Sequence, residues 1–280
     1  MHLLARLHSL AWRAGFDVLP VAPEGRHLRG VAEEDVYRIQ TLLGRMLGFS
    51  RSERTPTPIE WLDLTARALQ LAVDGTPPRA QLLQDVWVVR RSGEMRNGFF
   101  VEIGAADGLY LSNTYLLEKA FGWRGVLCEP NPSFAEHISE RGRSGSQLVA
   151  KAVTPRSGDT VTLEVADERS KVVSQHRRAL LGSRRQTVVQ VATISPTDLL
   201  LEAGAPSVVD YLSVDTEGSE PEILRAWPWT EHSVRFLTVE HNHVSGRLAQ
   251  LDLILLPRGF VRVLPEWSGV DAWYVHRDES

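Results

Sequence analysis

The pattern of hydrophobic and polar residues changes near residue 98. Before this point, apolar residues recur every three or four positions, as Val36, Ile39 and Leu43 do, which is the spacing of one helical face. After it, short apolar runs alternate with longer amphipathic stretches, which indicates strands alternating with helices. We therefore expect a mostly helical accessory region at residues 1–90 and a second domain at residues 91–280, with Gln84–Arg90 forming a helix or a short strand between them.

The runs that predict strands are short and almost continuously apolar. They are Phe99–Ile103, Gly125–Cys128, Gln147–Ala150, Asp210–Val214 and Val234–Val239. The stretches that predict helices are Asn113–Phe121, Pro132–Arg141, Pro196–Ala203, Glu220–Ala226 and Arg247–Leu256. Asn131-Pro132 and Ser195-Pro196 place a capping residue before a proline, and Ser219–Glu222 has the pattern of a capping box. Continuous apolar strands separated by helices are typical of a parallel sheet covered on both faces.

Two segments depart from this alternation. Thr160–Val165 and Gln186–Ile194 predict strands on either side of a polar, arginine-rich segment, Asp167–Arg185. Near the end, Phe260–Leu264 and Val270–His276 flank a glycine-containing turn and predict an antiparallel hairpin. The expected fold class is α/β: a Rossmann-like, doubly wound, mostly parallel sheet with a C-terminal antiparallel hairpin, plus an N-terminal helical extension.

Composition narrows the class of protein. Of the 280 residues, 43% are hydrophobic and 24% are charged, which is ordinary for a globular chain. The net charge of −4 argues against a nucleic-acid binder. The single cysteine, Cys128, excludes an internal disulfide and favours a cytoplasmic location. Arg6, His8 and Arg13 interrupt the apolar N-terminus, which therefore predicts an amphipathic helix or a cleaved targeting peptide and no membrane span.

A turn of small residues follows the first predicted strand and is the strongest candidate for a binding site. Gly104, Ala105 and Gly108 leave room for backbone N–H groups to approach a ligand closely. Glu102 and Asp107 place negative charge beside this turn. The turn therefore suits a ligand that carries positive charge better than a bare phosphate.

Two further acidic positions are expected to join this turn. Asp215 and Glu217 follow the fourth predicted strand, which doubly wound sheets commonly place beside the first. Glu129 ends the second predicted strand, 21 residues after Gly108, where a carboxylate can accept both ribose hydroxyls of an adenosine. One cofactor crevice at the carboxyl ends of the strands is therefore predicted.

The charges favour S-adenosylmethionine (SAM) over a dinucleotide. NAD would call for Gly-x-Gly-x-x-Gly, whereas this turn has two glycines and an added acid, Asp107, that would repel a pyrophosphate. SAM contains an adenosine, a sulfonium and an amino group but no phosphate. Two alternatives stay open on the residues alone: an NAD-dependent oxidoreductase or epimerase, and a non-catalytic module that binds a partner.

The chain resembles the FkbM family of SAM-dependent methyltransferases from about Gln84 to about His276. The similar motifs are Phe99–Gly108, Leu111-Ser112-Asn113-Thr114, Leu127–Pro130, Lys151-Ala152-Val153 and Val214–Glu220. The resemblance implies a seven-stranded Rossmann-like sheet and methyl transfer, often to a hydroxyl of a sugar or secondary metabolite. It also implies cofactor contacts from residues within these motifs, namely Glu102, Gly104, Ala105, Asp107, Gly108, Asn113, Glu129, Pro130, Lys151 and Ala152. The implied partner is a small-molecule or glycan acceptor, and the oligomeric state stays open.

Candidate catalytic residues follow the fourth and fifth predicted strands. Asp215 and Glu217 would position the acceptor, and His241 is a candidate general base because an imidazole titrates near neutral pH. Asp215, Glu240 and His241 also form a candidate ligand set for a divalent ion, for which oxygen ligands favour Mg²⁺ or Mn²⁺. The alternative for the histidine is an exposed position at a strand end.

Overall fold

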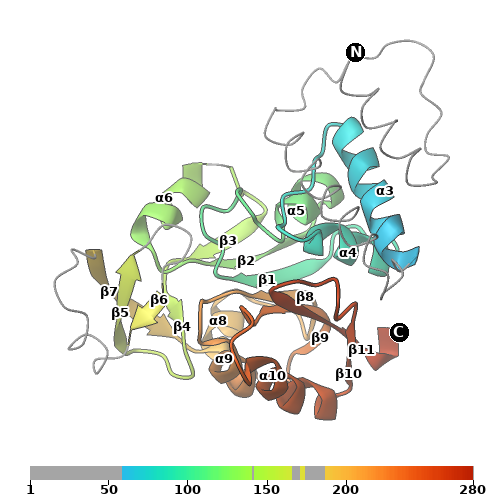
Figure 1. Cartoon of the computed structure of the whole chain (residues 1–280). Coiled ribbons are helices and arrows are strands. Elements are labelled where there is room, and N and C mark those ends of the chain that lie inside the picture. The colour runs from blue at the N-terminus through green and yellow to red at the C-terminus, as the bar shows by residue number, and fades with distance from the viewer. Residues whose placement is uncertain (1–58, 141, 166–170, 174–186, 280) are drawn as a thin grey trace. The chain divides into compact units, whose positions relative to one another are not determined.

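A computed structural model of the chain describes residues 59–140, 142–165, 171–173 and 187–279 (Figure 1). The predictions for residues 1–58, and for most of the polar segment at 167–185, lie outside the described residues. The chain divides into two compact units, Met1–Pro77 and Pro78–Ser280. The first unit contains helix α3 (Ile59–Val73), whose buried side chains Trp61, Leu64, Ala68 and Leu71 recur at helical spacing.

The second unit is built on a seven-stranded sheet. Its strands are β1 (Phe99–Ile103), β2 (Arg124–Cys128), β3 (Ser146–Val149), β8 (Val208–Val214), β9 (Ser233–Glu240), β10 (Phe260–Val263) and β11 (Asp271–His276). Their order is β10-β11-β9-β8-β1-β2-β3, and all neighbours are parallel except β11, which runs antiparallel to both β9 and β10. The predicted mostly parallel α/β sheet with a C-terminal hairpin is therefore confirmed, as is the adjacency of β1 and β8.

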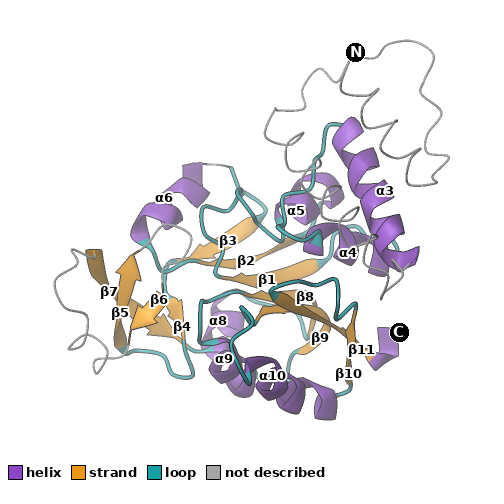
Figure 2. Cartoon of the chain, viewed as in Figure 1, coloured by secondary structure: helices purple, strands orange, loops and turns teal. Residues whose placement is uncertain are grey.

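Helices cover both faces of this sheet. They are α4 (Gln84–Arg91), α5 (Tyr115–Phe121), α6 (Pro132–Glu140), α8 (Pro196–Glu202), α9 (Glu220–Ala226) and α10 (Arg247–Leu255). Figure 2 shows α4, α5 and α6 on one face and α8, α9 and α10 on the other. This arrangement explains why the central strands carry apolar residues on both faces.

A second, smaller sheet lies beside the first. It contains β4 (Ala152–Val153), β5 (Thr160–Val165), β6 (Lys171–Val173) and β7 (Thr187–Ile194) in the order β4-β7-β5-β6. Strands β5 and β7 form the antiparallel pair that the sequence predicted around the polar segment, and β4 joins β7 in parallel. Leu163 and Val191 give this sheet a small apolar core of its own.

Packing on the two faces holds the strand ends in place. Under α4, the buried ring of Trp87 lies 5.1 Å from that of Trp273 and 6.0 Å from that of Phe236, measured between centroids. On the other face, Leu199 of α8 and Leu251 of α10 join the main core. The segment predicted as a helix or a short strand is therefore a helix, and it is packed onto the sheet.

Candidate functional site

The carboxyl ends of the strands present one row of acidic residues. Strand register aligns the last paired positions of β2, β1, β8 and β9, and the residues that follow them are Glu129, Gly104, Asp215 and Glu240. Glu240 is paired directly with Asp271 of β11. We call Glu129, Asp215, Glu240 and Asp271 the carboxylate row. Gly104 occupies the remaining position, between Glu129 and Asp215.

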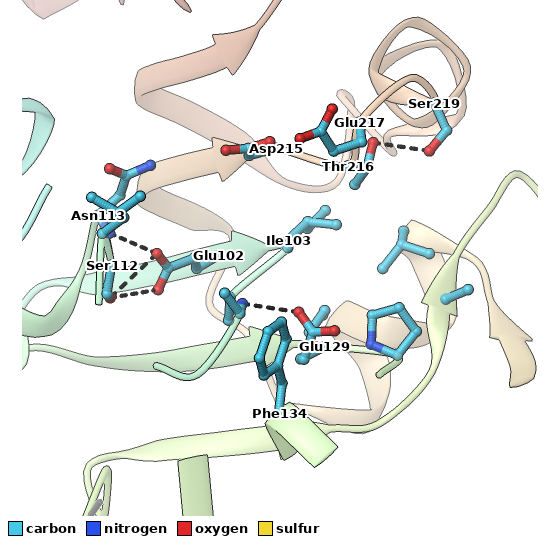
Figure 3. Close-up of a pocket in the computed structure, with 18 of the residues that line it drawn as sticks. Glu102, Ile103, Ser112, Asn113, Glu129, Phe134, Asp215, Thr216, Glu217 and Ser219 are labelled. Carbon is cyan, nitrogen blue, oxygen red and sulfur yellow. Dashed lines mark hydrogen bonds between the residues drawn. The ribbon is translucent and has the colours of Figure 1, made fainter. Parts of the chain in front are cut away.

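A cleft opens over part of this row (Figure 3). It is lined by most of the predicted site residues, namely Glu102, Gly104, Ala105, Asn113, Glu129, Pro130, Lys151, Ala152, Asp215 and Glu217. Asp107, Gly108, Glu240 and His241 are not among the lining residues. The structure therefore brings together the turns after β1, β2 and β8, as the topology predicted.

Gly104 allows two of these turns to touch. Its φ is +88°, and a Cβ atom built on it would lie 1.7 Å from the backbone oxygen of Asp215. The Gly104 N–H also donates to the carbonyl of Cys128 at 2.9 Å. Only glycine combines this backbone conformation with this approach, so Gly104 joins the loops that follow β1, β2 and β8.

Glu129 ties the first turn to the second. Its Oε2 accepts the N–H of Ala106 at 2.9 Å and its Oε1 accepts the N–H of Asn131 at 2.8 Å. Burial raises the pKa of Glu129 to about 7, even though these two N–H groups favour the ionised form. Each oxygen retains a lone pair, so the carboxylate can also accept hydrogen bonds from a ligand in the cleft.

Glu102 organises the segment that carries Asn113. It accepts hydrogen bonds from the hydroxyls of Ser112 and Thr114 and from the backbone N–H of Asn113. The buried guanidinium of Arg143 donates to the same two hydroxyls. Burial raises the pKa of Glu102, while Arg143 and these hydrogen bonds oppose the rise. Glu102 therefore shapes the cleft wall as well as lining it.

Asn113 presents an unused acceptor. Its side chain is 8% exposed, and its Nδ2 donates to the Ser213 hydroxyl at 2.9 Å. Its Oδ1 is buried and has no hydrogen-bond partner. A buried polar atom without a partner is costly, so a donor from a bound ligand would complete this group.

Asp107 and Gly108 do not line the cleft, but they shape the turn that follows β1. The carboxylate of Asp107 accepts the N–H groups of Leu109 at 2.9 Å and Tyr110 at 2.7 Å. Gly108 has a φ of +72°, and a Cβ there would lie 2.8 Å from Ile138. Their predicted contacts with a cofactor stay predictions.

The prediction of a capping box at Ser219–Glu222 was wrong. Ser219 makes no side-chain cap to helix α9, and its hydroxyl bonds to that of Thr216 instead. The fully buried Glu220 organises the turn, since its Oε1 accepts the N–H groups of Thr216 at 3.1 Å and Gly218 at 2.8 Å. Arg247 lies 3.3 Å from the other oxygen of Glu220.

The carboxylates after β8 and β9 have raised pKa values, although a hydrogen bond with Asp215 opposes the rise at Glu240. Asp215 is exposed at the cleft, and nearby protein atoms that displace water, together with the negative charge of Glu240, raise its pKa well above its usual range. Burial and the charge of Glu217 raise the pKa of Glu240 to about 8. Burial likewise raises the pKa of Asp271 to about 6. Asp215 and Glu240 therefore share a proton near neutral pH.

His241 has both ring nitrogens engaged. Its Nε2 lies 3.1 Å from the carbonyl oxygen of Asp271, and its Nδ1 accepts the N–H of His243 at 3.1 Å. Burial lowers the pKa of His241, and neighbouring His243 adds to the effect. Within the described residues no group of three or more His, Cys, Asp or Glu is arranged to hold a metal ion. The predicted site for Mg²⁺ or Mn²⁺ is therefore not supported.

Strained backbone gathers around the cleft. Ala106, Leu111, Glu217, Asn242 and His243 all have φ values between +45° and +58° although none is glycine. Such residues persist where the surroundings impose them, and they concentrate at functional sites. These five lie in the loops after β1, β8 and β9.

The sequence did not predict the apolar wall of the cleft. Phe134 of α6, Val153 of β4 and Leu163 of β5 line it. Lys151 reaches outward, and its Nζ lies 2.9 Å from Glu202. Phe134 follows the predicted cap at Asn131-Pro132 by two residues, and this was the signal that could have identified it.

A comparison with known protein families identifies the domain that contains the cleft. A family model described as the methyltransferase FkbM domain matches residues 102–262. No curated protein matches the sequence significantly.

None of the helices in the described ranges combines the length and apolar character needed to cross a bilayer.

Several solved structures are similar to the chain. One is the methyltransferase FkbM from Methylobacillus flagellatus KT, with 14% identity and a TM-score of 0.42 over 86% of this chain and 59% of that one. This chain therefore spans about three-fifths of that chain. Another is precorrin-6y C5,15-methyltransferase from Geobacter metallireducens GS-15, with 13% identity and a TM-score of 0.39 over 70% and 86% of the two chains. A third is the METTL16 MTase domain, with 13% identity and a TM-score of 0.40 over 92% and 97%.

Proposed function

The chain belongs to the FkbM family of methyltransferases, and from this premise we propose that it methylates a hydroxyl group of a sugar or secondary metabolite. The family implies that SAM is the methyl donor. The observation that supports this proposal most strongly is the carboxylate row, because it places negative charge beside Gly104, where the backbone is open to a ligand. A cofactor with positive charge and no phosphate suits such a cleft.

The residues of the cleft fit SAM. Glu129 has free lone pairs for the two ribose hydroxyls, and the unpaired Oδ1 of Asn113 can accept a hydrogen bond from the amino group of the methionine part. Phe134, Val153 and Leu163 offer an apolar surface for the adenine. A dinucleotide would instead bring its pyrophosphate close to the acids of the row.

Asp215 is the residue that we propose to act on the acceptor. SAM, when bound, supplies an electrophilic methyl group, which the acceptor oxygen takes as the carbon–sulfur bond breaks. Asp215 lines the cleft and, in its ionised form, accepts the proton of the hydroxyl, and the neighbouring carboxylate of Glu240 helps to hold that proton. Glu217, held by the side-chain amide of Asn242 at 3.2 Å, orients the acceptor beside it.

His241 takes a supporting role in this proposal. Its ring nitrogens bond the backbone around Asp271 and His243, so the imidazole holds the end of β9 against the start of β11. Asp215 is the better candidate for the base because its carboxylate reaches the cleft.

Two measurements test the proposal. Titration calorimetry should show binding of SAM and S-adenosylhomocysteine and none of NAD, and binding of NAD alone would refute the cofactor assignment. Labelled SAM should then transfer its methyl group to members of a panel of hydroxylated sugars and metabolites, with mass spectrometry locating the methyl group on oxygen. Products methylated only on carbon or nitrogen would contradict O-methylation while leaving the family assignment intact.

A further inference from the structure

One buried arginine holds the wall of the cleft between Gly108 and Thr114 from behind. Arg143 lies in the loop between α6 and β3, its side chain is 1% exposed, and it is not among the residues that line the cleft. Its Nη1 donates to the carbonyl oxygen of Gly108 at 2.6 Å and to the Ser112 hydroxyl at 3.2 Å. Its Nη2 donates to the Thr114 hydroxyl at 2.8 Å. One guanidinium therefore joins both ends of this wall.

The guanidinium of Arg143 is itself anchored away from the cleft. Its Nε donates to the carboxylate of Glu118 on α5 at 2.8 Å. Its central carbon lies 5.5 Å from the centre of the Tyr115 ring and 5.9 Å from that of the Phe100 ring. Because a guanidinium presents its donors in a rigid fork, this anchor also fixes the directions of the N–H groups that reach the cleft wall.

These N–H groups decide where two hydroxyl protons point. Arginine can only donate, so the hydroxyls of Ser112 and Thr114 accept from it and direct their own protons elsewhere. Both hydroxyls donate to the carboxylate of Glu102, which is 2% exposed and lines the cleft (Figure 3). Arg143 therefore sets up Glu102 as an acceptor through two intervening hydroxyls.

Asn113 is the last link between this network and the cofactor. Its backbone N–H donates to Glu102 at 2.7 Å, and its Nδ2 donates to the Ser213 hydroxyl on β8 at 2.9 Å. Its Oδ1, which has no hydrogen-bond partner among the described residues, is the atom that we assign to the amino group of SAM. An acceptor that is already in place binds more tightly, because no ordering has to accompany binding.

We propose that Arg143 is a positioning residue for SAM binding, which acts on the methionine part of the cofactor through Glu102 and Asn113. The inference rests on the proposed function, and it makes the hydroxyl of Thr114 a relay between Arg143 and Glu102. Cutting this relay weakens SAM binding although every residue that lines the cleft is kept. A role in stability alone would lower the free energy of unfolding and leave the SAM affinity of the folded protein unchanged.

The first test changes Thr114, which is fully buried and is not among the lining residues. Thr114→Val keeps the size of the side chain and removes the hydroxyl, whereas Thr114→Ser keeps the hydroxyl. The Thr114 side chain makes no cap hydrogen bond to α5, so neither change uncaps that helix. In titration calorimetry, the Kd for SAM should rise about tenfold in Thr114→Val and stay within about twofold of wild type in Thr114→Ser.

A second ligand locates the effect on the cofactor. 5′-Methylthioadenosine has the adenosine and sulfur of SAM but lacks the amino acid part that we place at Asn113. Its Kd should be the same, within about twofold, in wild type and Thr114→Val. Unchanged SAM affinity in a folded Thr114→Val, an equal loss in Thr114→Ser, or an equal loss for both ligands would overturn the inference.

The arginine itself is tested by Arg143→Lys, which keeps the charge but replaces the fork by a single ammonium. The Kd for SAM should again rise about tenfold. Arg235→Lys is the matched control, because Arg235 joins two carboxylates, Asp210 at 3.0 Å and Glu279 at 2.6 Å, near the start of β9 and away from the strand ends that carry the cleft. Its Kd should stay within about twofold of wild type, and equal losses in the two lysine variants would reject the positioning role.

The two proposals fail in different ways. A wild-type protein that binds no SAM refutes the proposed function before any variant is made. A wild-type protein that binds SAM, with folded variants that bind it equally well, keeps the proposed function and loses this inference. If Thr114→Val and Arg143→Lys both fail to fold, the inference is also rejected, because the network then serves the stability of the fold.

Discussion

The affinity for SAM should fall as the pH is lowered from 8 to 6, because the carboxylate assigned to the ribose titrates in this range. Burial raises the pKa of Glu129 to about 7, the N–H groups of Asn131 and Ala106 lower it, and the charge of Glu102 raises it further. In the proposed complex the ribose hydroxyls donate to the ionised carboxylate. Binding therefore favours the ionised form and lowers this pKa.

The size of the effect follows from that pKa. With a pKa of about 7 in the empty cleft, about ten molecules in eleven carry an ionised Glu129 at pH 8, and about one in eleven at pH 6. If the ribose hydroxyls bind only the ionised form, the Kd for SAM rises about tenfold between these values, or ~1.4 kcal/mol. The direction is fixed, since protonation removes acceptor capacity from the carboxylate.

Titration calorimetry at pH 6, 7 and 8, at constant ionic strength, measures this dependence. The variant Glu129→Gln supplies the control, because its amide does not titrate. It should bind SAM about 1–3 kcal/mol more weakly at pH 8 and show little change with pH. A pH dependence that persists in the variant would assign the effect to another acid of the row, such as Asp271. Unchanged affinity of a folded variant at pH 8 would refute the ribose assignment.

Three further predictions concern the same cleft. Gly104→Ala should abolish SAM binding and lower the free energy of unfolding by about 2–4 kcal/mol, because its Cβ would overlap the backbone oxygen of Asp215. Gly158→Ala, with a similar φ of +85° and no atom within 4 Å, is its control, and denaturant curves that coincide would contradict the argument. Asp215→Asn should lower kcat by about 10²–10⁴-fold and leave the Kd for SAM within about threefold, and an equal loss of both would place Asp215 in the cofactor shell. The ligand-free protein should lose thermal stability as the pH rises from 5 to 8. The folded state keeps protons on Glu129 and Glu240 up to pKa values of about 7 and about 8, whereas the unfolded chain releases them near 4.5, and a flat or rising Tm in scanning calorimetry would contradict this.

The sequence predicted the strands closely because each is an apolar run with a clear end. The run at Phe99–Ile103 is bounded by Gly98 and Gly104, and it forms β1 with the same limits. The helix at Glu220–Ala226 also has the predicted limits. The adjacency of β1 and β8 followed from the topology that such alternation favours. The expected strand order was therefore enough to predict that Gly104 and Asp215 lie close together.

Helix starts show where local patterns fail. Ser195 and Ser219 both precede a predicted helix, but only Ser195 caps one. Ser195 has extended backbone with a ψ of 155°, and its hydroxyl accepts the N–H of Asp198 at 3.1 Å. Ser219 has a ψ of 8°, because Glu217 and Gly218, both at positive φ, turn the chain just before it. The residues alone do not show this backbone conformation, which is imposed by the close approach of neighbouring loops.

Residue patterns alone did not predict the complete carboxylate row. Glu129, Asp215 and Glu240 were each identified as a strand-end acid, but Asp271 was not, because it opens a strand instead of ending one. The antiparallel direction of β11 brings the start of that strand to the same edge as the ends of the others. A predicted hairpin indicates this reversal, but its register decides whether Asp271 or a neighbour meets Glu240. Register depends on how the whole strand packs, which a short pattern does not specify.

The arrangement of the row gives a physical reason for the separate cofactor and acceptor halves that we propose. Glu129 and Asp215 lie two strand positions apart, about 10 Å, with Gly104 between them. Salt weakens the interaction of charges at that separation where water reaches the cleft, as it does at the exposed Asp215, so each half can be adjusted to its own ligand. Glu240 and Asp271 are direct neighbours and Asp215 shares a proton with Glu240, so these three respond to a ligand as one group. The glycine that lets the loops touch therefore also divides the row, and the two halves meet where a methyl group would pass from one ligand to the other.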